Sequence, residues 1–347
     1  MTKIALITDT HFGMKKGSQI FHDYFEKFYN ETFFPTLDAR SIDTVIHLGD
    51  VFDVRKGIDY WSLDWAKRVV FQPLYDSGIE THIIVGNHDI FYRQSLKINA
   101  PALNLNEFTN IITYAEPTTA NIRGTEIFMI PWVCEDNADD FVRERDASKA
   151  KVAMGHLEVA GFYANSTYQV QHGLGAEVFS QFDQVFSGHY HKKNGSGNIL
   201  YLGNPYQMYW NDYGDTRGFH IYDTETGELE FIPNKNEMFH KIYYNEDKKK
   251  LVNHTKAKNC YVKLIVEGKS TPARLNQLID KLYKVGIHDL KVIENTDISI
   301  DDDVEVEAED TLTTLTNYVN AMEDTTTEER ESLIGIFKSL YVESQEV

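Results

Sequence analysis

Five short polar motifs, each placed at the end of an apolar run, constrain this chain more than any other feature of its sequence. The apolar runs lie at 3–8, 44–48, 81–85, 151–154 and 184–187, and their Val- and Ile-rich composition predicts buried strands. Ligands of open α/β sheets bind beyond the carboxyl ends of the strands. We therefore expect the motif side chains to meet at one edge of one sheet, as in a metal site. The motifs are Asp9-Thr10-His11, Gly49-Asp50, Gly86-Asn87-His88-Asp89, Gly155-His156 and Gly188-His189-Tyr190-His191.

Length and composition limit the class of protein. A chain of 347 residues, 42% of them hydrophobic, is long enough for a large core and a second small domain. No apolar run approaches the roughly 18 residues that span a bilayer, and the first residues lack a signal-peptide pattern. Cys134 and Cys260 do not have the spacing of a metal site or a disulfide framework. We expect a protein of the reducing cytoplasm (the host cytoplasm if a phage encodes it) with no membrane association.

The charge of the chain bears on its partners. A net charge of −19 argues at first sight against a nucleic-acid ligand. The charge is uneven, however, because 15 of the 53 acidic residues but only two of the 34 basic residues lie between Asp297 and Val347. The remainder has a net charge of −6, and the predicted site would hold divalent cations. The argument against nucleic acid is therefore weakened but not removed.

Alternation of strand and helix patterns extends from residue 1 to about 245. Helices are predicted at 19–34, 60–76 and 94–108, and further strands at 126–130, 199–202, 218–222 and 229–232. Such alternation followed by several late strands predicts an α/β domain with two sheets flanked by helices. Within it, His47 and His82 lie inside strand runs and are interpreted as structural.

The last hundred residues divide into three parts. Residues 246–296 predict a small βαβ unit, whose helix begins after the Thr271-Pro272 pair and ends at Gly286. Residues 297–310 form an acidic linker. Residues 311–347 predict two short amphipathic helices, with an apolar stripe that either contacts a partner protein or docks back on the body.

Seven side chains of the motifs are suitable metal ligands. Carboxylate, amide and imidazole groups without thiolate suit a hard or borderline divalent cation. Seven ligands are too many for one tetrahedral ion, and they suit two ions that share a carboxylate and together polarise a phosphoryl group. The predicted ligands are Asp9, His11, Asp50, Asn87, His156, His189 and His191.

The motif set resembles that of the calcineurin-like metallophosphoesterases. Its order and spacing, with the βαβ unit and the acidic helical tail, are similar to the nuclease subunit of the double-strand-break repair nuclease–ATPase complex, which includes the SbcD-type proteins and their phage counterparts. The resemblance implies a four-layer α-β-β-α sandwich over residues 1–245, a capping domain at 246–296 that presents DNA, and partner-binding helices at 311–347.

The same resemblance assigns roles to the motif residues. It implies two Mn²⁺ ions, with Mg²⁺ as the alternative, which Asp50 bridges. His88 would be the catalytic histidine, and Asp89 would orient it through a hydrogen bond. The first ion would be bound by Asp9, His11, Asp50 and His191, and the second by Asp50, Asn87, His156 and His189.

The implied function is a manganese-dependent DNA nuclease with 3′-to-5′ exonuclease and single-strand endonuclease action. The implied partners are DNA and an SMC-like coiled-coil ABC ATPase bound through the C-terminal helices, with a homodimer inside a heterotetramer. One position departs from many members, because Asp53 stands where they carry a second histidine. Arg55, Lys56 and Lys248–Lys250 either contact DNA or lie on the surface without such a role. The aromatic residues either pack in the core or stack on unpaired bases; they are Tyr206, Tyr209, Trp210 and Tyr213.

Two alternatives remain open on the sequence alone. A phosphatase or small-molecule phosphodiesterase would use the same fold, although the Gly-Asp-x-x-Asp-Arg-Gly signature of the protein phosphatases fails where Val54 follows Asp53. The second alternative is a scaffold protein without enzymatic activity, and the complete set of metal ligands argues against it. Trp61 and Trp65 mark one helix face that is either core or a dimer contact.

Overall fold

The computed structural model describes residues 2–163, 169–246, 254–268 and 270–295, together with residues 330 and 333. It divides the chain into two compact units, residues 1–293 and 294–347. The first unit contains all five motifs. In the second, Arg330 and Leu333 are helical. The predicted acidic linker, the rest of the predicted helices at 311–347, and Lys248–Lys250 lie outside the described residues.

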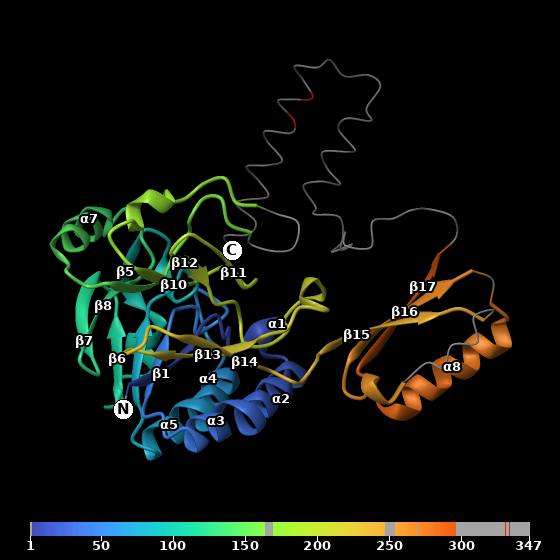
Figure 1. Ribbon diagram of the computed structural model, residues 1–347. Helices are drawn as coiled ribbons and strands as arrows, with labels where there is room; N and C mark the ends of the chain where they lie inside the picture. The colour runs from blue at the N-terminus through green and yellow to red at the C-terminus, as the bar shows by residue number, and fades with distance from the viewer. Residues whose placement is uncertain are drawn as a thin grey trace. The chain divides into compact units, whose positions relative to one another are not determined.

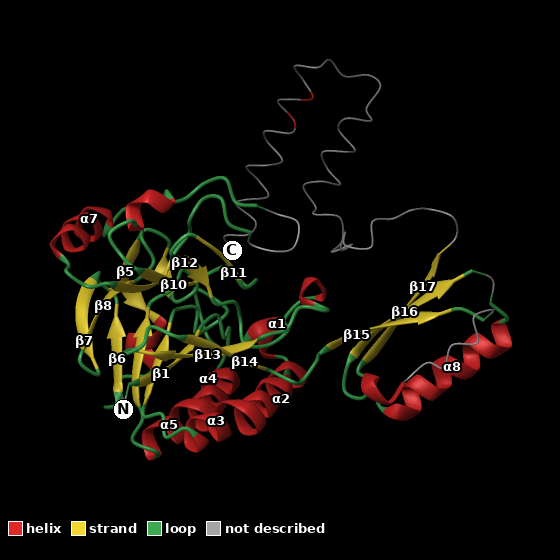
Figure 2. Ribbon diagram, in the orientation of Figure 1, coloured by secondary structure: helices red, strands yellow, loops and turns green. Residues whose placement is uncertain are grey.

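The first sheet contains six strands in the order β14-β13-β1-β2-β3-β6 (Figures 1 and 2). The strands β1, β2, β3 and β6 are parallel, whereas β13 is antiparallel to β1 and β14 to β13. Three of the motifs therefore leave the same edge of this sheet. The strands are β1 (Lys3–Ile7), β2 (Thr44–His47), β3 (Glu80–Ile84), β6 (Ile111–Tyr114), β13 (Gly218–Asp223) and β14 (Leu229–Pro233).

The second sheet also has six strands, in the order β11-β12-β10-β9-β8-β7. The strands β8, β9, β10 and β12 are parallel, with β7 and β11 antiparallel at the two edges. The other two motifs lie at the carboxyl ends of β9 and β10. The strands are β7 (Thr118–Ile122), β8 (Thr125–Ile130), β9 (Val152–His156), β10 (Gln184–Gly188), β11 (Asn194–Ser196) and β12 (Ile199–Tyr201).

Three apolar clusters define four layers. Successive residues of a strand face opposite sides of its sheet. Ile4 therefore packs with Met129 between the two sheets, while Ile7 packs against the helices on the outer face of the first sheet. Phe128 faces the other way, towards Phe141 of the helix α7 (Ala138–Ala147), on the outer face of the second sheet. The predicted α-β-β-α arrangement is confirmed.

Two long helices cover the outer face of the first sheet (Figure 1). Each is continuous but widens for one π-helical turn, η1 or η2, just before a proline, Pro35 or Pro73. Proline has no N–H to donate and its ring displaces the carbonyl one turn earlier, which explains the wider turn. The segments are α2 (Gln19–Phe28), η1 (Tyr29–Phe33) and α3 (Phe34–Ala39), then α4 (Tyr60–Ala66), η2 (Lys67–Phe71) and α5 (Gln72–Asp76).

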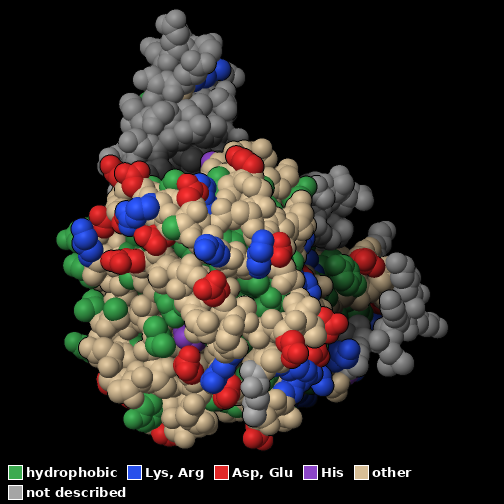
Figure 3. All heavy atoms as spheres, turned by 60° about the vertical axis from the view of Figure 1, so that its left-hand side comes forward, with side chains coloured by type: hydrophobic (Ala, Val, Ile, Leu, Met, Phe, Trp, Pro, Cys, Tyr) green, Lys and Arg blue, Asp and Glu red, His purple; other side chains and the backbone are tan. Residues whose placement is uncertain are grey.

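The remaining elements of the body are short. One prediction is largely wrong: of the predicted helix 94–108 only Ala100–Asn104 is helical, because Ser95–Asn99 forms β5 and pairs with β4. The side chain of Asn99 accepts a hydrogen bond from the Ala102 amide and starts α6 there. On the face that carries β7 and α7, basic and acidic side chains are intermixed (Figure 3). The elements are α1 (Met14–Gly17), β4 (Ile90–Tyr92), β5 (Ser95–Asn99), α6 (Ala100–Asn104), α7 (Ala138–Ala147), η3 (Ala176–Phe179) and η4 (Trp210–Asp212).

A small α/β unit follows the body. Its sheet has the order β15-β16-β17, and β15 is parallel to β16. The helix begins after Thr271 and ends at Gly286, which adopts a left-handed φ of 87°, as the sequence predicts. The first strand, β15, begins before residue 246, so the predicted βαβ unit gains a third strand. The elements are β15 (Phe239–Tyr244), η5 (His254–Ala257), β16 (Tyr261–Glu267), α8 (Pro272–Val285) and β17 (Asp289–Asn295).

Aromatic contacts attach this small unit to the body. The ring centroids of Phe21 on α2 and Tyr261 on β16 lie 5.9 Å apart, and those of Trp210 and Phe239 lie 4.8 Å apart. Phe239 is part of the same buried cluster as the helices of the body. Among the described residues, no helix is both long enough and apolar enough to cross a membrane.

Candidate metal centre

The structure brings together all seven predicted ligands, which we call the ligand cluster. They come from the ends of two sheets and not from one sheet, which corrects the sequence-based expectation. The pairing of β9 with β8 and β10 places the last two motifs in the second sheet. From the first sheet come Asp9, His11, Asp50 and Asn87, and from the second come His156, His189 and His191.

One half of the cluster consists of Asp9, His11 and His191. Their ligand atoms all lie within 4.8 Å of one another. The Nε2 atoms of His11 and His191 are 3.1 Å apart, and Nε2 of His191 is 4.0 Å from Oδ1 of Asp9. Asp9 and His11 are both buried. These three side chains match one of the two ligand sets that the family resemblance implies.

The other half is centred on Asn87. Its Oδ1 lies 2.9 Å from Nε2 of His156 and 3.0 Å from Nδ1 of His189. Asp50, His156 and His189 also form a group whose ligand atoms lie within 4.8 Å of one another. These side chains correspond to the second implied set.

Asp50 connects the two halves. Its Oδ2 lies 3.7 Å from Nε2 of His11 in one half and 3.3 Å from Nε2 of His156 in the other. Its Oδ1 accepts a hydrogen bond of 2.8 Å from the backbone N–H of His88, which fixes the carboxylate. Asp50 is therefore placed as a carboxylate shared between two cations would be.

The backbone at the ligands is held in an uncommon conformation. Asp9, His11, Asp50 and His189 all have left-handed φ values, of 52°, 45°, 54° and 86°. Asp and His enter this region more readily than most residues, but each such position still costs of order 1–2 kcal/mol. At Gly86 a Cβ would clash with the Asp50 carboxylate. The chain turns sharply at each strand end so that the ligand side chains point to one place.

The orientation of the ring nitrogens tests whether a cation fits this cluster. Nδ1 of His156 lies 2.8 Å from the carbonyl oxygen of Leu48, which requires a proton on Nδ1. In the neutral ring, Nε2 then presents a lone pair to the oxygens of Asn87 and Asp50, which are also acceptors. Electron pairs that converge on one space favour a cation there. The nitrogen and oxygen donors therefore fit a divalent metal.

The pKa values of the cluster follow from the same geometry. Burial alone would lower the pKa of His156, but the Asp50 carboxylate outweighs it and raises the pKa to about 9. At His11 burial is outweighed by Asp53 and Asp50, and its pKa is also raised to about 9. Burial would raise the pKa of Asp50, yet the imidazoles of His156 and His88 hold it well below its usual range. A metal ion competes with the protons for these lone pairs.

His88 lies beside the ligand cluster, and burial lowers its pKa. Its Nδ1 donates to the carbonyl oxygen of Asp53 at 2.6 Å, so Nε2 is the nitrogen left to act on a substrate. The expected hydrogen bond from Asp89 to His88 is wrong. Asp89 accepts instead from the backbone N–H groups of Val51, Phe52 and Gly86 at 3.0–3.2 Å, and so braces two ligand loops against each other.

Two acidic side chains at the cluster escaped the sequence analysis. Oδ1 of Asp53 lies 3.2 Å from Nδ1 of His11, where a carboxylate orients a metal-ligating imidazole. Glu158 lies 3.8 Å from Nε2 of His189. The sequence marks Asp53 only as the residue that stands in place of a histidine. For Glu158, its position two residues after the ligand His156 is the one signal that could have indicated a role at the site. The indole of Trp132, also missed, lies with its ring centroid 5.0 Å from that of His189.

Other predicted residues have structural roles. Arg55 donates from Nε to the carbonyl oxygen of Asn87 at 2.9 Å, so it supports a ligand loop. His47 and His82 are buried, as expected. On the predicted helix face, Trp65 is buried, whereas Trp61 is 42% exposed.

The aromatic stretch divides between core and surface. Tyr206 is buried and its hydroxyl donates to the carbonyl oxygen of Thr10 at 2.6 Å. Tyr209, Trp210 and Tyr213 are partly exposed. Each has a lysine ammonium over its ring, at 4.6 Å (Lys15 on Tyr209), 4.2 Å (Lys263 on Trp210) and 5.2 Å (Lys241 on Tyr213). We call these three pairs the lysine–aromatic row.

The two-sheet sandwich and the ligand cluster define a metallophosphoesterase. The chain belongs to the calcineurin-like phosphoesterase family, whose model matches residues 2–193. That match includes every member of the ligand cluster. The predicted family and the predicted enzyme class, a metal-dependent phosphoesterase, are confirmed.

Two relatives with named functions are similar to this chain in sequence. The chain is 36% identical over 307 residues to "Exonuclease subunit 1" of Enterobacteria phage T4, with 88% of both proteins covered. It is 29% identical over 136 residues to "DNA double-strand break repair protein Mre11" of Saccharolobus solfataricus, a match that covers 38% of this chain and 34% of that protein. A solved structure described as a novel archaeal phosphodiesterase is 14% identical with a TM-score of 0.35, and the match covers 67% of this chain and 99% of that one.

Proposed function

We propose that this protein is a DNA nuclease that uses two Mn²⁺ ions to hydrolyse phosphodiester bonds, as a 3′-to-5′ exonuclease and a single-strand endonuclease. The observation that carries the proposal is the position of Asp50 between two groups of ligands. The exonuclease and repair names of the relatives support DNA as the substrate. An imidazole-rich cluster favours Mn²⁺ over Mg²⁺, which prefers an all-oxygen shell.

The proposed ligand sets follow the two halves of the cluster. Asp9, His11 and His191 would hold one ion, and Asn87, His156 and His189 the other, with Asp50 shared. When bound, the pair of ions would lower the pKa of a water molecule and polarise the phosphoryl group. His88 would place Nε2 against the leaving oxygen or the developing negative charge, while Asp53 holds its ring through Nδ1.

DNA must reach this cluster despite the acidic chain. Basic residues follow the ligands at two places, namely Lys15 and Lys16 after His11, and Lys192 and Lys193 after His191. The lysine–aromatic row begins beside His191, whose ring centroid lies 6.4 Å from that of Tyr209. In the proposal, these lysines bind phosphates and free the rings to stack on the bases of a single strand.

We predict that the triple substitution of Lys15, Lys241 and Lys263 by Ala weakens DNA binding in a salt-dependent way. The slope of log K against log salt should fall by about 0.7 for each lost phosphate contact on single-stranded DNA, and the DNA-to-small-diester ratio of kcat/KM should fall by about tenfold. Fluorescence anisotropy at several salt concentrations measures the slope. An unchanged slope would remove this row from the DNA path.

Partners complete the proposal. An SMC-like coiled-coil ABC ATPase would bind residues 311–347, and a homodimer would form within a heterotetramer in the cytoplasm. The exposed rings of Tyr60 and Trp61 on α4 support a protein contact on that helix, since Tyr60 is 91% exposed.

Deleting residues 311–347 should abolish co-purification with the ATPase and leave hydrolysis of a small diester intact. Retention of the ATPase by the shortened chain would contradict this assignment.

The decisive experiment compares substrates under one set of conditions. The purified protein with Mn²⁺ is assayed on linear duplex DNA, single-stranded circles, a phosphopeptide and a cyclic nucleotide. We expect turnover of both DNA substrates to exceed that of the other two by orders of magnitude in kcat/KM. Preference for the phosphopeptide or the cyclic nucleotide would instead make the protein a phosphatase or a small-molecule phosphodiesterase of the same family.

A further inference from the structure

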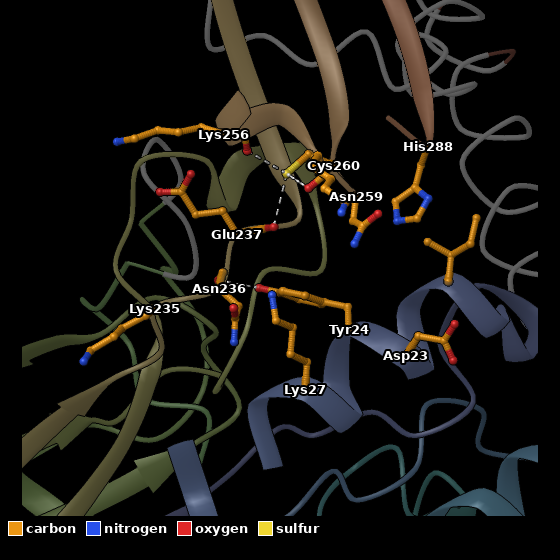
Figure 4. A pocket seen from close by; sticks show the side chains of 12 residues that line it. Asp23, Tyr24, Lys27, Lys235, Asn236, Glu237, Lys256, Asn259, Cys260 and His288 are labelled. Carbon is orange, nitrogen blue, oxygen red and sulfur yellow. Dashed lines mark hydrogen bonds between the residues drawn. The ribbon is translucent and has the colours of Figure 1, made fainter. Parts of the chain in front are cut away.

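A cavity of about 470 Å³ opens where α2 meets the small α/β unit, and none of its lining residues belongs to the ligand cluster. Figure 4 shows that its walls come from segments far apart in sequence: the helix α2 with Tyr24 and Lys27, the connection from β14 to β15 with Asn236, the turn before β16 with Cys260, and His288 just before β17. A molecule in this cavity would touch both the body and the small unit.

The cavity is basic although the chain is strongly acidic. Lys27, Lys235, Lys256 and Lys258 line it, all four are exposed, and within the described ranges no salt bridge is found for any of them. Asp23 and Glu237 are the acidic members of the lining, so the lysines outnumber the carboxylates by two. Like charges held around one concave surface repel each other, and an anion between them relieves that repulsion.

The walls are held in place by contacts of their own. The hydroxyl of Tyr24 donates to the carbonyl oxygen of Asn236 at 3.0 Å, which ties α2 to the β14–β15 connection. The Sγ atom of Cys260 lies 3.4 Å from the carbonyl oxygen of Glu237, which ties the same connection to β16. A concave site with fixed walls binds a ligand without first having to order itself.

Size and shape select among anions. A volume of about 470 Å³ is within the range of small-molecule sites. A duplex presents a convex backbone, which does not fill a cavity of this form, whereas a short chain of phosphates can bring several charged oxygens to several ammonium groups. His288 in the lining adds an imidazole next to which a base can lie.

We propose that this cavity binds a compact polyphosphate of the size of a nucleoside di- or triphosphate. The bound ligand would link α2 to the β15–β17 unit and hold the two in one arrangement. The proposal does not depend on the nuclease assignment, because its residues and its test are separate from the ligand cluster.

The test is a binding titration of the full chain in EDTA, which keeps nucleotides from binding at the cluster through a metal. ATP, inorganic tripolyphosphate and adenosine are titrated by isothermal calorimetry, and thermal unfolding is followed in parallel. We expect ATP and tripolyphosphate to bind and to raise Tm, and adenosine not to bind. In the double variant K256E/K258E the affinity should fall by about tenfold or more, equivalent to about 1.4 kcal/mol or more.

A matched control has the same change of net charge elsewhere. Lys149 and Lys151, both exposed on the segment before β9, are replaced by Glu, and this variant should bind ATP within about twofold of the parent. Unchanged Tm without ligand shows that both variants fold. The proposal is overturned if neither polyphosphate binds at millimolar concentration, if both variants lose equal affinity, or if a DNA oligonucleotide but not tripolyphosphate binds and is lost in K256E/K258E.

Discussion

Replacing Asp50 with alanine should reduce hydrolysis of DNA and of a small phosphodiester by roughly 10³-fold or more, a loss of about 4 kcal/mol of transition-state stabilisation. Its Oδ2 lies within 3.7 Å of a ring nitrogen in each half of the cluster, so one substitution removes a ligand from both proposed ions. Turnover with Mn²⁺ on both substrates measures the loss.

Thermal unfolding gives a second readout of the same variant. Metal that binds the folded state at 100 times its Kd stabilises the parent by about 2.7 kcal/mol, so Mn²⁺ should raise the Tm of the parent. The Asp50→Ala protein should show little of this rise. Asp183→Ala is the matched control, because its carboxylate is exposed on the segment before β10. An Asp50→Ala protein that keeps both the Mn²⁺ response and parental turnover would refute the bridging role.

Local signals explain why much of the fold could be predicted. The five apolar runs became β1, β2, β3, β9 and β10 with shifts of two residues or fewer at their ends. Strand propensity and the Gly or Asp that stops each run act within a few residues, so they are legible in the sequence. The helix after Thr271 was predicted for the same reason, since a proline at its first position and Gly286 at its end are local features.

Pairing between strands far apart in sequence explains which parts of the fold could not be predicted. Whether β9 joins the first sheet or a second one depends on which strand it pairs with, and β8 and β10 decide that over long distances. The helical spacing within 94–108 was overridden in the same way. Residues Ser95–Asn99 gain a β-hairpin with Ile90–Tyr92, and tertiary pairing outweighs weak helix propensity.

The candidate site shows the same division. Ligand types could be predicted because their motifs are short and follow strands. The contacts of Asp53, Asp89 and Glu158 could not be predicted, because each side chain contacts a residue far away in sequence. Asp53 contacts His11, Asp89 contacts the amide of Val51, and Glu158 contacts His189. Asp89 was expected next to His88, its neighbour in sequence, but its side chain turns to the amides of Val51 and Phe52.

Replacing His88 with alanine should separate metal binding from catalysis. We expect kcat on DNA to fall by about 10²–10⁴-fold, the usual contribution of a positioned acid or base, while the Mn²⁺-induced rise in Tm stays near that of the parent. The reason is geometric: Nδ1 of His88 is committed to the Asp53 carbonyl and its backbone N–H holds Asp50. Its side chain lies next to His11 but is not a member of either proposed ligand set. The backbone contact survives the substitution.

The choice of substrate then distinguishes the two roles open to His88. If its Nε2 protonates the leaving oxygen, bis-p-nitrophenyl phosphate, whose leaving group needs no proton, should lose far less activity in His88→Ala than DNA does. If it stabilises charge on the phosphoryl oxygens, both substrates should lose activity equally, and His88→Gln, which can donate a hydrogen bond but not titrate, should restore part of it. His240→Ala is the control, because this histidine on β15 lies 3.8 Å from Glu237 and belongs to neither ligand set. Parental turnover in His88→Ala, or a lost Mn²⁺ response, would contradict its placement beside the metals as a catalytic group.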